Sequence, residues 1–179
     1  FNYNYKEKYL VEFNGRYDGS SKFPKGHRFG FFPSFSVGYN IAKEEFWPLK
    51  DEVGNFKLRA SWGSLGNQSV ANYLYLATVN IGTKYGYIID GSLPNTLGTP
   101  GLISPDLTWE TANTLDFGFD VSFLSNRLDL SFDWYNRQTL NMFGPSEPVP
   151  AVIGVGLPQQ NNADLSTKGF ELVVNWRDR

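Results

Sequence analysis

Apolar and polar residues alternate along most of this chain. Between residues 9 and 18 the odd positions are mainly apolar or aromatic and the even positions mainly polar, and residues 29–42 repeat the same order. Successive side chains of a β-strand point to opposite faces of its sheet. Each run therefore predicts a strand with one apolar face and one polar face.

Four further segments alternate in the same way, at residues 56–62, 115–123, 128–135 and 170–177. The pattern over residues 1–179 therefore predicts six strands, and in addition a short stub at residues 1–5, in an all-β, antiparallel arrangement. We expect one continuous, strongly tilted sheet whose two outermost strands have no partner within the chain, and which further strands of a longer polypeptide cover. Phe117 and Leu130 are expected near the middle of the apolar face, with Asp116 and Asp129 on the polar face.

The connections between these runs alternate in length. Residues 6–8 and 124–127 predict tight turns, whereas residues 18–28, 66–107 and 140–167 are longer and rich in Gly, Pro, Asn and Ser. Outer-membrane barrels have this asymmetry, with short periplasmic turns and long external loops. Residues 43–55 predict a small surface element around residues 44–47, and residues 73–79 with 84–89 predict an external hairpin.

A soluble β-sandwich also has alternating strands and frequent turns, but three features favour a membrane barrel. The alternating runs reach lengths that cross a bilayer, above the roughly 5 or 6 residues of a globular strand. Acidic residues stand in mid-strand on the polar face. Aromatic residues stand at strand ends, where membrane barrels place their interfacial girdles; they are Tyr17, Phe29, Tyr39, Trp109, Phe123 and Trp176.

Composition agrees with the barrel and excludes other classes. Aromatic residues make up 17% of the chain and charged residues only 19%. No segment has the roughly 20 consecutive apolar residues of a spanning helix. A formal net charge of -2 without a basic cluster argues against nucleic-acid binding, and zero cysteines exclude a disulfide framework.

Candidate catalytic groups are few, and each has a simpler explanation. His27 is the one histidine and stands in a predicted loop beside other charged residues. Asp116 with Asp120, or Asp129 with Asp133, resembles a glycosidase pair, but a water-filled barrel requires inward polar groups at the same spacing. The sequence therefore predicts no enzyme, no cofactor and no metal site. Substrate-binding residues stay unassigned, although the loop tyrosines Tyr73, Tyr75, Tyr85 and Tyr87 suit either sugar stacking or loop packing.

Several segments, in order along the chain, carry a family resemblance. They include Asn4-Tyr5-Lys6-Glu7-Lys8-Tyr9-Leu10, Phe56-Lys57-Leu58-Arg59-Ala60-Ser61-Trp62-Gly63, Pro105-Asp106-Leu107-Thr108-Trp109-Glu110-Thr111 and Lys168-Gly169-Phe170-Glu171-Leu172. In these segments the chain resembles the SusC/RagA family of TonB-dependent transporters. The likeness covers nearly all of the sequence and is weakest at residues 70–104 and 143–162.

The resemblance implies a 22-stranded outer-membrane barrel, of which residues 1–179 are an internal piece without plug, signal peptide or C-terminal strand. It also implies import of oligosaccharides or peptides, with a SusD-like surface lipoprotein, with TonB acting through another part of the protein, and with outer-membrane lipid around the barrel. A secreted carbohydrate-binding β-sandwich is the alternative from another class. The two differ in solubility, because the sandwich folds without detergent.

Overall fold

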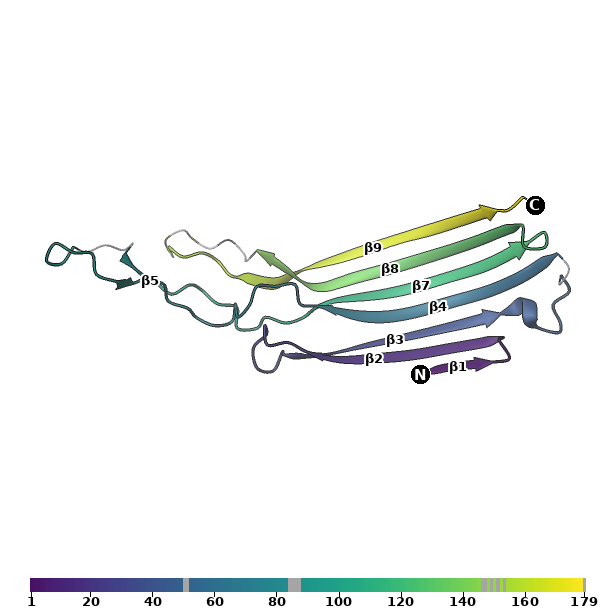
Figure 1. The fold of residues 1–179 in the computed structure, drawn as a ribbon, viewed down its shortest axis with the longest axis horizontal. Helices are drawn as coiled ribbons and strands as arrows, with labels where there is room; N and C mark the ends of the chain where they lie inside the picture. The colour runs from purple at the N-terminus through teal and green to yellow at the C-terminus, as the bar shows by residue number, and fades with distance from the viewer. Residues whose placement is uncertain are drawn as a thin grey trace.

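One antiparallel sheet dominates the computed structural model, which describes residues 1–49, 52–83, 88–145, 148, 150, 152 and 154–178. The sheet has seven strands in the order β1-β2-β3-β4-β7-β8-β9. Their bounds are Asn2–Tyr5 (β1), Tyr9–Gly19 (β2), Phe29–Asn40 (β3), Val53–Asn67 (β4), Glu110–Phe123 (β7), Leu128–Pro145 (β8) and Gln159–Trp176 (β9). Neighbours along the chain are neighbours in the sheet, and its outermost strands β1 and β9 have no second partner among the described residues (Figure 1). The predicted continuous sheet is confirmed.

The tight turns between β1 and β2 and between β7 and β8 lie at one end of the sheet, together with the longer connection between β3 and β4 (Figure 1). We call this the end with the short connections. The connections between β2 and β3, β4 and β7, and β8 and β9 lie at the opposite end, which we call the end with the long connections. Between β1 and β2, Lys6 and Glu7 both have positive φ, and Lys8 N–H donates to Tyr5 C=O, which defines a type I′ hairpin turn. Residues 124–126 also have positive φ in the turn between β7 and β8. The predicted short element near residue 44 is a 3₁₀ turn at Ile41–Lys43 (η1), followed by further turns.

Two expectations about the long connections are wrong. Residues 140–167 were expected to form a loop, but β8 and β9 have 18 residues each and fill most of that range. The pairing of β8 with β9 shifts register between Thr139 and Met142. Asn141 lies at this bulge with φ of 57°, and its N–H donates to Asp164 Oδ1 at 2.9 Å. Residues 136–139 of β8 are all polar although their pairing with β9 is regular, so the alternation stops before the strand does. The extra residue at the bulge then shifts the period-two pattern further along the strand.

The expected hairpin in the longest connection is also wrong. Residues 73–79 form turns and irregular structure. The two strands in this region are instead β5 (Ile81–Gly82) and β6 (Thr96–Leu97), which pair with each other. Residues 84–87, including Tyr85 and Tyr87, lie outside the described residues. Two-residue strands carry too little sequence for an alternation to be visible.

The strand register sorts the side chains onto the two expected faces. Residues directly opposite each other in a ladder share a face, and across the middle of the sheet most rungs are either mainly apolar or mainly polar. One apolar rung crosses all seven strands through Tyr3, Val11, Val37, Ala60, Phe117, Trp134 and Phe170. The next polar rung consists of Asn2, Glu12, Ser36, Ser61, Asp116, Tyr135 and Gly169. We call these sides the apolar face and the polar face.

The limit of the apolar face runs obliquely across the sheet. On the apolar face of β9 the last apolar residue toward the long connections is Phe170, and Lys168 follows on the same face. In β2 the apolar set continues to Tyr17, which is six residues beyond Val11 on the rung of Phe170. Six residues along a strand span about 20 Å, and the five strand-to-strand spacings from β2 to β9 span about 24 Å. The limit of the apolar face therefore makes an angle of about 40° with the rungs. If this limit is parallel to the membrane plane, the strands are tilted by the same angle from the membrane normal. Closed barrels require a tilt of about 35 to 45°.

Side chains of the apolar face are exposed rather than packed in a core. Phe170 is 73% exposed and Phe31 is 59% exposed, for example. A sandwich would cover this face with a second sheet, but the second described sheet contains only β5 and β6. The architecture therefore excludes the sandwich alternative. Within the described residues, no helix has the length and apolar character needed to cross a membrane.

Candidate functional site

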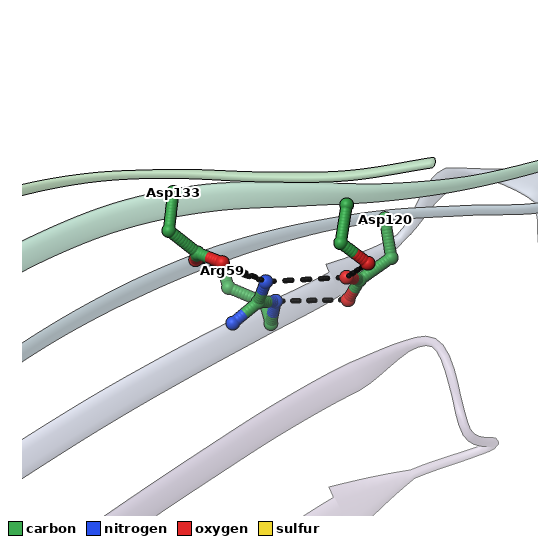
Figure 2. A network of polar contacts seen from close by, with 4 residues as sticks. Arg59, Asp120 and Asp133 are labelled. Carbon is green, nitrogen blue, oxygen red and sulfur yellow. Dashed lines mark hydrogen bonds and ion pairs between the residues drawn. The ribbon is translucent and has the colours of Figure 1, made fainter. Parts of the chain in front are cut away.

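A charged network occupies the middle of the polar face. The Arg59 guanidinium contacts Asp120 through Nε at 2.8 Å and through a terminal nitrogen at 3.1 Å. The same terminal nitrogen lies 2.9 Å from Asp133 Oδ1, and Ser131 Oγ donates to Asp120 Oδ1 at 2.9 Å. Figure 2 shows Arg59 between the two carboxylates. One guanidinium thus connects β4, β7 and β8.

Gly118 makes this network possible, and sequence reasoning missed it. Gly118 stands directly between Arg59 and Asp133 on one rung of the sheet. A Cβ at this position would lie 2.1 Å from Asp133 Oδ1 and 2.8 Å from the carbonyl oxygen of Phe132. The missing side chain lets Arg59 reach across one whole strand. Its role depends on the register of three strands, so no local pattern marks it.

Three of the four carboxylates considered as glycosidase pairs, Asp120, Asp129 and Asp133, have structural partners. Asp120 and Asp133 share Arg59. Asp129 accepts from Ser122 Oγ at 2.7 Å and forms an ion pair with Arg177 at 3.3 Å. Asp116 lies opposite Ser61 in the ladder. In this arrangement the acidic residues pair across strands of the polar face, as a polar barrel interior requires.

A second polar cluster closes the end with the short connections. Glu44 is buried, and its carboxylate accepts from Lys8 Nζ at 2.8 Å and from Tyr9 Oη at 2.9 Å. The hydrogen bond from Lys8, and next that from Tyr9, lowers the pKa of Glu44. The same contact with Glu44 raises the pKa of Lys8. The Tyr9 ring also stacks on Tyr39 at 5.1 Å, so this cluster ties the 3₁₀ turn to the sheet.

An aromatic cluster forms the buried core at the end with the long connections. Phe23, Phe32, Val70, Leu107 and Trp109 are its buried members, and Leu74 and Phe143 pack against them. These residues come from two connections, β2 to β3 and β4 to β7, and from two strands, β3 and β8. Trp109 was expected in an interfacial girdle, but it is only 7% exposed and its indole N–H donates to Arg28 C=O. It precedes β7, so the strand alternation does not govern its direction.

Polar contacts fix the same connections to one another and to β9. Lys22 Nζ donates to the carbonyl oxygens of Gln68 and Val70 at 3.3 and 3.0 Å. Asn161 binds both the N–H and the C=O of Thr108, at 2.9 and 3.0 Å. Because Phe32 lies opposite Arg16 in the polar set, the aromatic cluster sits on the polar side of the sheet.

The remaining candidates do not assemble into a catalytic centre. His27 lies in a turn and its backbone N–H donates to Pro24 C=O at 3.1 Å. Tyr73 and Tyr75 lie close together in the longest connection, with ring centroids 6.4 Å apart. Among the residues that the structure describes, no group of three or more His, Cys, Asp or Glu side chains could hold a metal ion.

A single tilted sheet with an exposed apolar face and a polar face of paired charges defines the wall of a membrane-spanning β-barrel. The chain belongs to the TonB-dependent receptor family: the family model described as "TonB dependent receptor-like, beta-barrel" matches residues 1–178. This family consists of outer-membrane transporters and not of enzymes. We therefore expect the apolar face to contact lipid and the polar face to line the barrel interior.

Individual relatives place the chain in the SusC/RagA group. It is 38% identical to TonB-dependent receptor P3 of Formosa agariphila over 99% of the chain, and 31% identical to TonB-dependent receptor SusC of Bacteroides thetaiotaomicron over 97%. The RagAB peptide importer in its closed-closed state superposes with a TM-score of 0.82, at 26% identity over 97% of this chain and 18% of that chain. The chain spans 17% of the length of each of the two curated relatives. The resemblance inferred from the sequence is confirmed.

Proposed function

We propose that residues 1–179 form one run of adjacent strands in the wall of an importer that takes oligosaccharides or peptides across the outer membrane. The main support is the structural agreement of 97% of this chain with a chain of the RagAB peptide importer, at a TM-score of 0.82. The sequence likeness to SusC over 97% of the chain supports the same proposal. A barrel wall alone performs no active transport, so the activity belongs to the full-length protein.

In this proposal the two faces have separate tasks. The apolar face anchors the wall in outer-membrane lipid. The polar face, with the Arg59 network at its centre, presents fixed charges to whatever part of the full-length protein or cargo fills the interior. The connections held by the aromatic cluster form part of the external mouth, where a SusD-like surface lipoprotein would close over the substrate. Energy would come from TonB through a segment outside these residues.

Uptake by cells tests the proposal. Cells lacking the full-length gene are compared with complemented cells for uptake of fluorescently labelled oligosaccharides and peptides. We expect uptake of one of these classes to depend on the gene and to disappear in a strain without TonB. Copurification of a surface lipoprotein with the tagged transporter tests the partner. Equal uptake with and without the gene, for both classes, would refute the proposed function.

A further inference from the structure

The connection between β3 and β4 folds over the apolar face of the sheet. The Trp47 ring packs on Phe56, with ring centroids 5.6 Å apart. Phe56 lies opposite Val121 in the ladder, on the apolar face. Val121 is only 9% exposed, whereas Phe117, on the same face of the same strand, is 48% exposed. At the end with the short connections, this segment therefore covers part of a face that is exposed elsewhere.

Polar contacts hold the segment in this position. Glu44 is buried, and its Oε1 accepts from Tyr9 Oη at 2.9 Å and from Tyr39 Oη at 3.4 Å. Both tyrosines stand on the same rung as Leu58, which belongs to the apolar face. Trp47 N–H donates to Glu44 C=O at 3.3 Å, which closes a turn between these two residues. The segment is therefore tied to the apolar side of the sheet at both Glu44 and Trp47.

Two apolar side chains of the same segment have little cover. Phe46 is 70% exposed and Leu49 is 43% exposed, and they stand on either side of Trp47 in the sequence. Water is an unfavourable surrounding for such side chains. Aromatic and aliphatic groups are stable at the boundary between lipid headgroups and acyl chains. Because Trp47 packs on Phe56, these side chains continue the apolar face. We call Phe46, Trp47 and Leu49 the interface patch.

The interface patch lies near the depth at which a bilayer changes from acyl chains to headgroups. From β9 to β2 the limit of the apolar face moves toward the long connections by about one residue per strand. With this limit parallel to the membrane plane, the depth of Phe119 on β7 corresponds to a point between Leu58 and Ala60 on β4. Phe56 is about three residues nearer the short connections, which at a tilt of about 40° is about 8 Å of depth. The apolar band of such barrels extends about 12 Å to either side of its middle. Trp47, which packs on Phe56, therefore lies close to the boundary.

We propose that the interface patch docks onto the phospholipids of the periplasmic leaflet, and that Phe46 enters the boundary between headgroups and acyl chains. The end with the short connections is the periplasmic end of an outer-membrane barrel. The occupant is lipid rather than protein, because the patch continues the face that we expect to contact lipid, at a depth that lipid occupies. The proposal concerns how the barrel wall is held in the membrane, and it does not depend on the cargo.

The test uses the full-length protein in vesicles of phosphatidylethanolamine and phosphatidylglycerol, with a fluorescent label on a single cysteine. Residues 1–179 contain no cysteine, and any cysteine elsewhere is replaced by serine. Phe46→Cys carries the label in the interface patch. Ile81→Cys is the matched control in water, since Ile81 is 69% exposed in the longest connection, and Phe117→Cys is the control in lipid. The quenchers are iodide on both sides of the membrane and lipids with a nitroxide either near the headgroup or near the chain end. Heat-modifiable migration on gels checks that each labelled barrel is folded.

We expect the nitroxide near the headgroup to quench the label of Phe46→Cys more strongly than the nitroxide near the chain end. Iodide should quench it at most about half as strongly as the label of Ile81→Cys. Iodide quenching equal to that of Ile81→Cys overturns the proposal. Weak quenching by iodide and by both nitroxides also overturns it, because protein then covers the patch. Either result leaves the import function standing, since the dependence of cargo uptake on the gene tests that function by itself.

Discussion

A series of arginine substitutions along β7 tests which face meets lipid and how deep each position lies. The apolar residues of β7 are Leu115, Phe117, Phe119, Val121 and Phe123, so the middle of the set is Phe119. Phe117, which the sequence predicts near the middle of its strand, is the next residue of the apolar face from Phe119 toward the long connections. Successive residues of the apolar face are about 6.8 Å apart along the strand, which at a tilt of about 40° gives about 5 Å of depth. The three positions from Phe119 to Leu115 therefore sample the membrane from its middle toward its outer boundary.

The expected costs follow this depth. A basic side chain at the bilayer midplane costs about 2 to 4 kcal/mol of barrel stability, falling to about 0 to 1 near the interface. We expect Phe119→Arg in the upper range, Leu115→Arg in the lower, and Phe117→Arg between them. Phe119 and Phe117 each also lose a stacked partner, Phe132 at 5.5 Å and Trp134 at 6.1 Å. This loss is similar at both positions and cancels in their difference.

The full-length protein is unfolded with urea after insertion into lipid vesicles, and the folded fraction is read from heat-modifiable migration on gels. Asp116→Asn and Asp129→Asn are the controls, since both residues lie on the polar face and should leave the free energy of unfolding nearly unchanged. Costs that do not decrease from Phe119 to Leu115 would refute the depth assignment. Loss of the folded band in the aspartate variants, with the arginine variants tolerated, would show that the two faces are reversed.

Three further predictions use the same unfolding assay. Gly118→Ala should destabilise the barrel by about 1 to 3 kcal/mol, because its Cβ would displace Asp133 and press on a backbone carbonyl; a wild-type midpoint would show that the sheet adapts. Arg59→Met should lower the free energy of unfolding by about 1 to 3 kcal/mol, because Asp120 and Asp133 lose their cation. A smaller shift of the unfolding midpoint than in Gly118→Ala would contradict the view that position 118 is a glycine because of this network. The lowered pKa of Glu44 means that the contribution of its contact with Lys8 is complete above the ordinary pKa of 4.5 and is lost as pH falls through the lower, folded-state value. Glu44→Gln should remove that part of the acid sensitivity, and an unchanged pH profile would contradict the assignment.

The strands were predictable where neighbouring residues determine them. Alternation over residues 115–123 reflects two different solvents on the two faces, and that signal is local in sequence. The signal ended early in β8 because beyond the membrane both faces meet water, and residues 136–139 are all polar. Trp109 was misplaced for a related reason: a residue outside the ladder takes its direction from tertiary packing. The aromatic cluster joins residues from Phe23 to Phe143 and therefore left no local pattern.

The polar face also carries most of the information that fixes the register of the wall. On the apolar face a shift by two residues would still place aromatic or aliphatic side chains opposite one another, as Phe119 and Phe132 are now. On the polar face the same shift would move Asp133 about 6.8 Å from its place beside Arg59. Gly118 would then no longer stand between Arg59 and Asp133. A shift by one residue would expose Asp133 to lipid. The network therefore discriminates against both slips, whereas the apolar face resists only the shift by one residue.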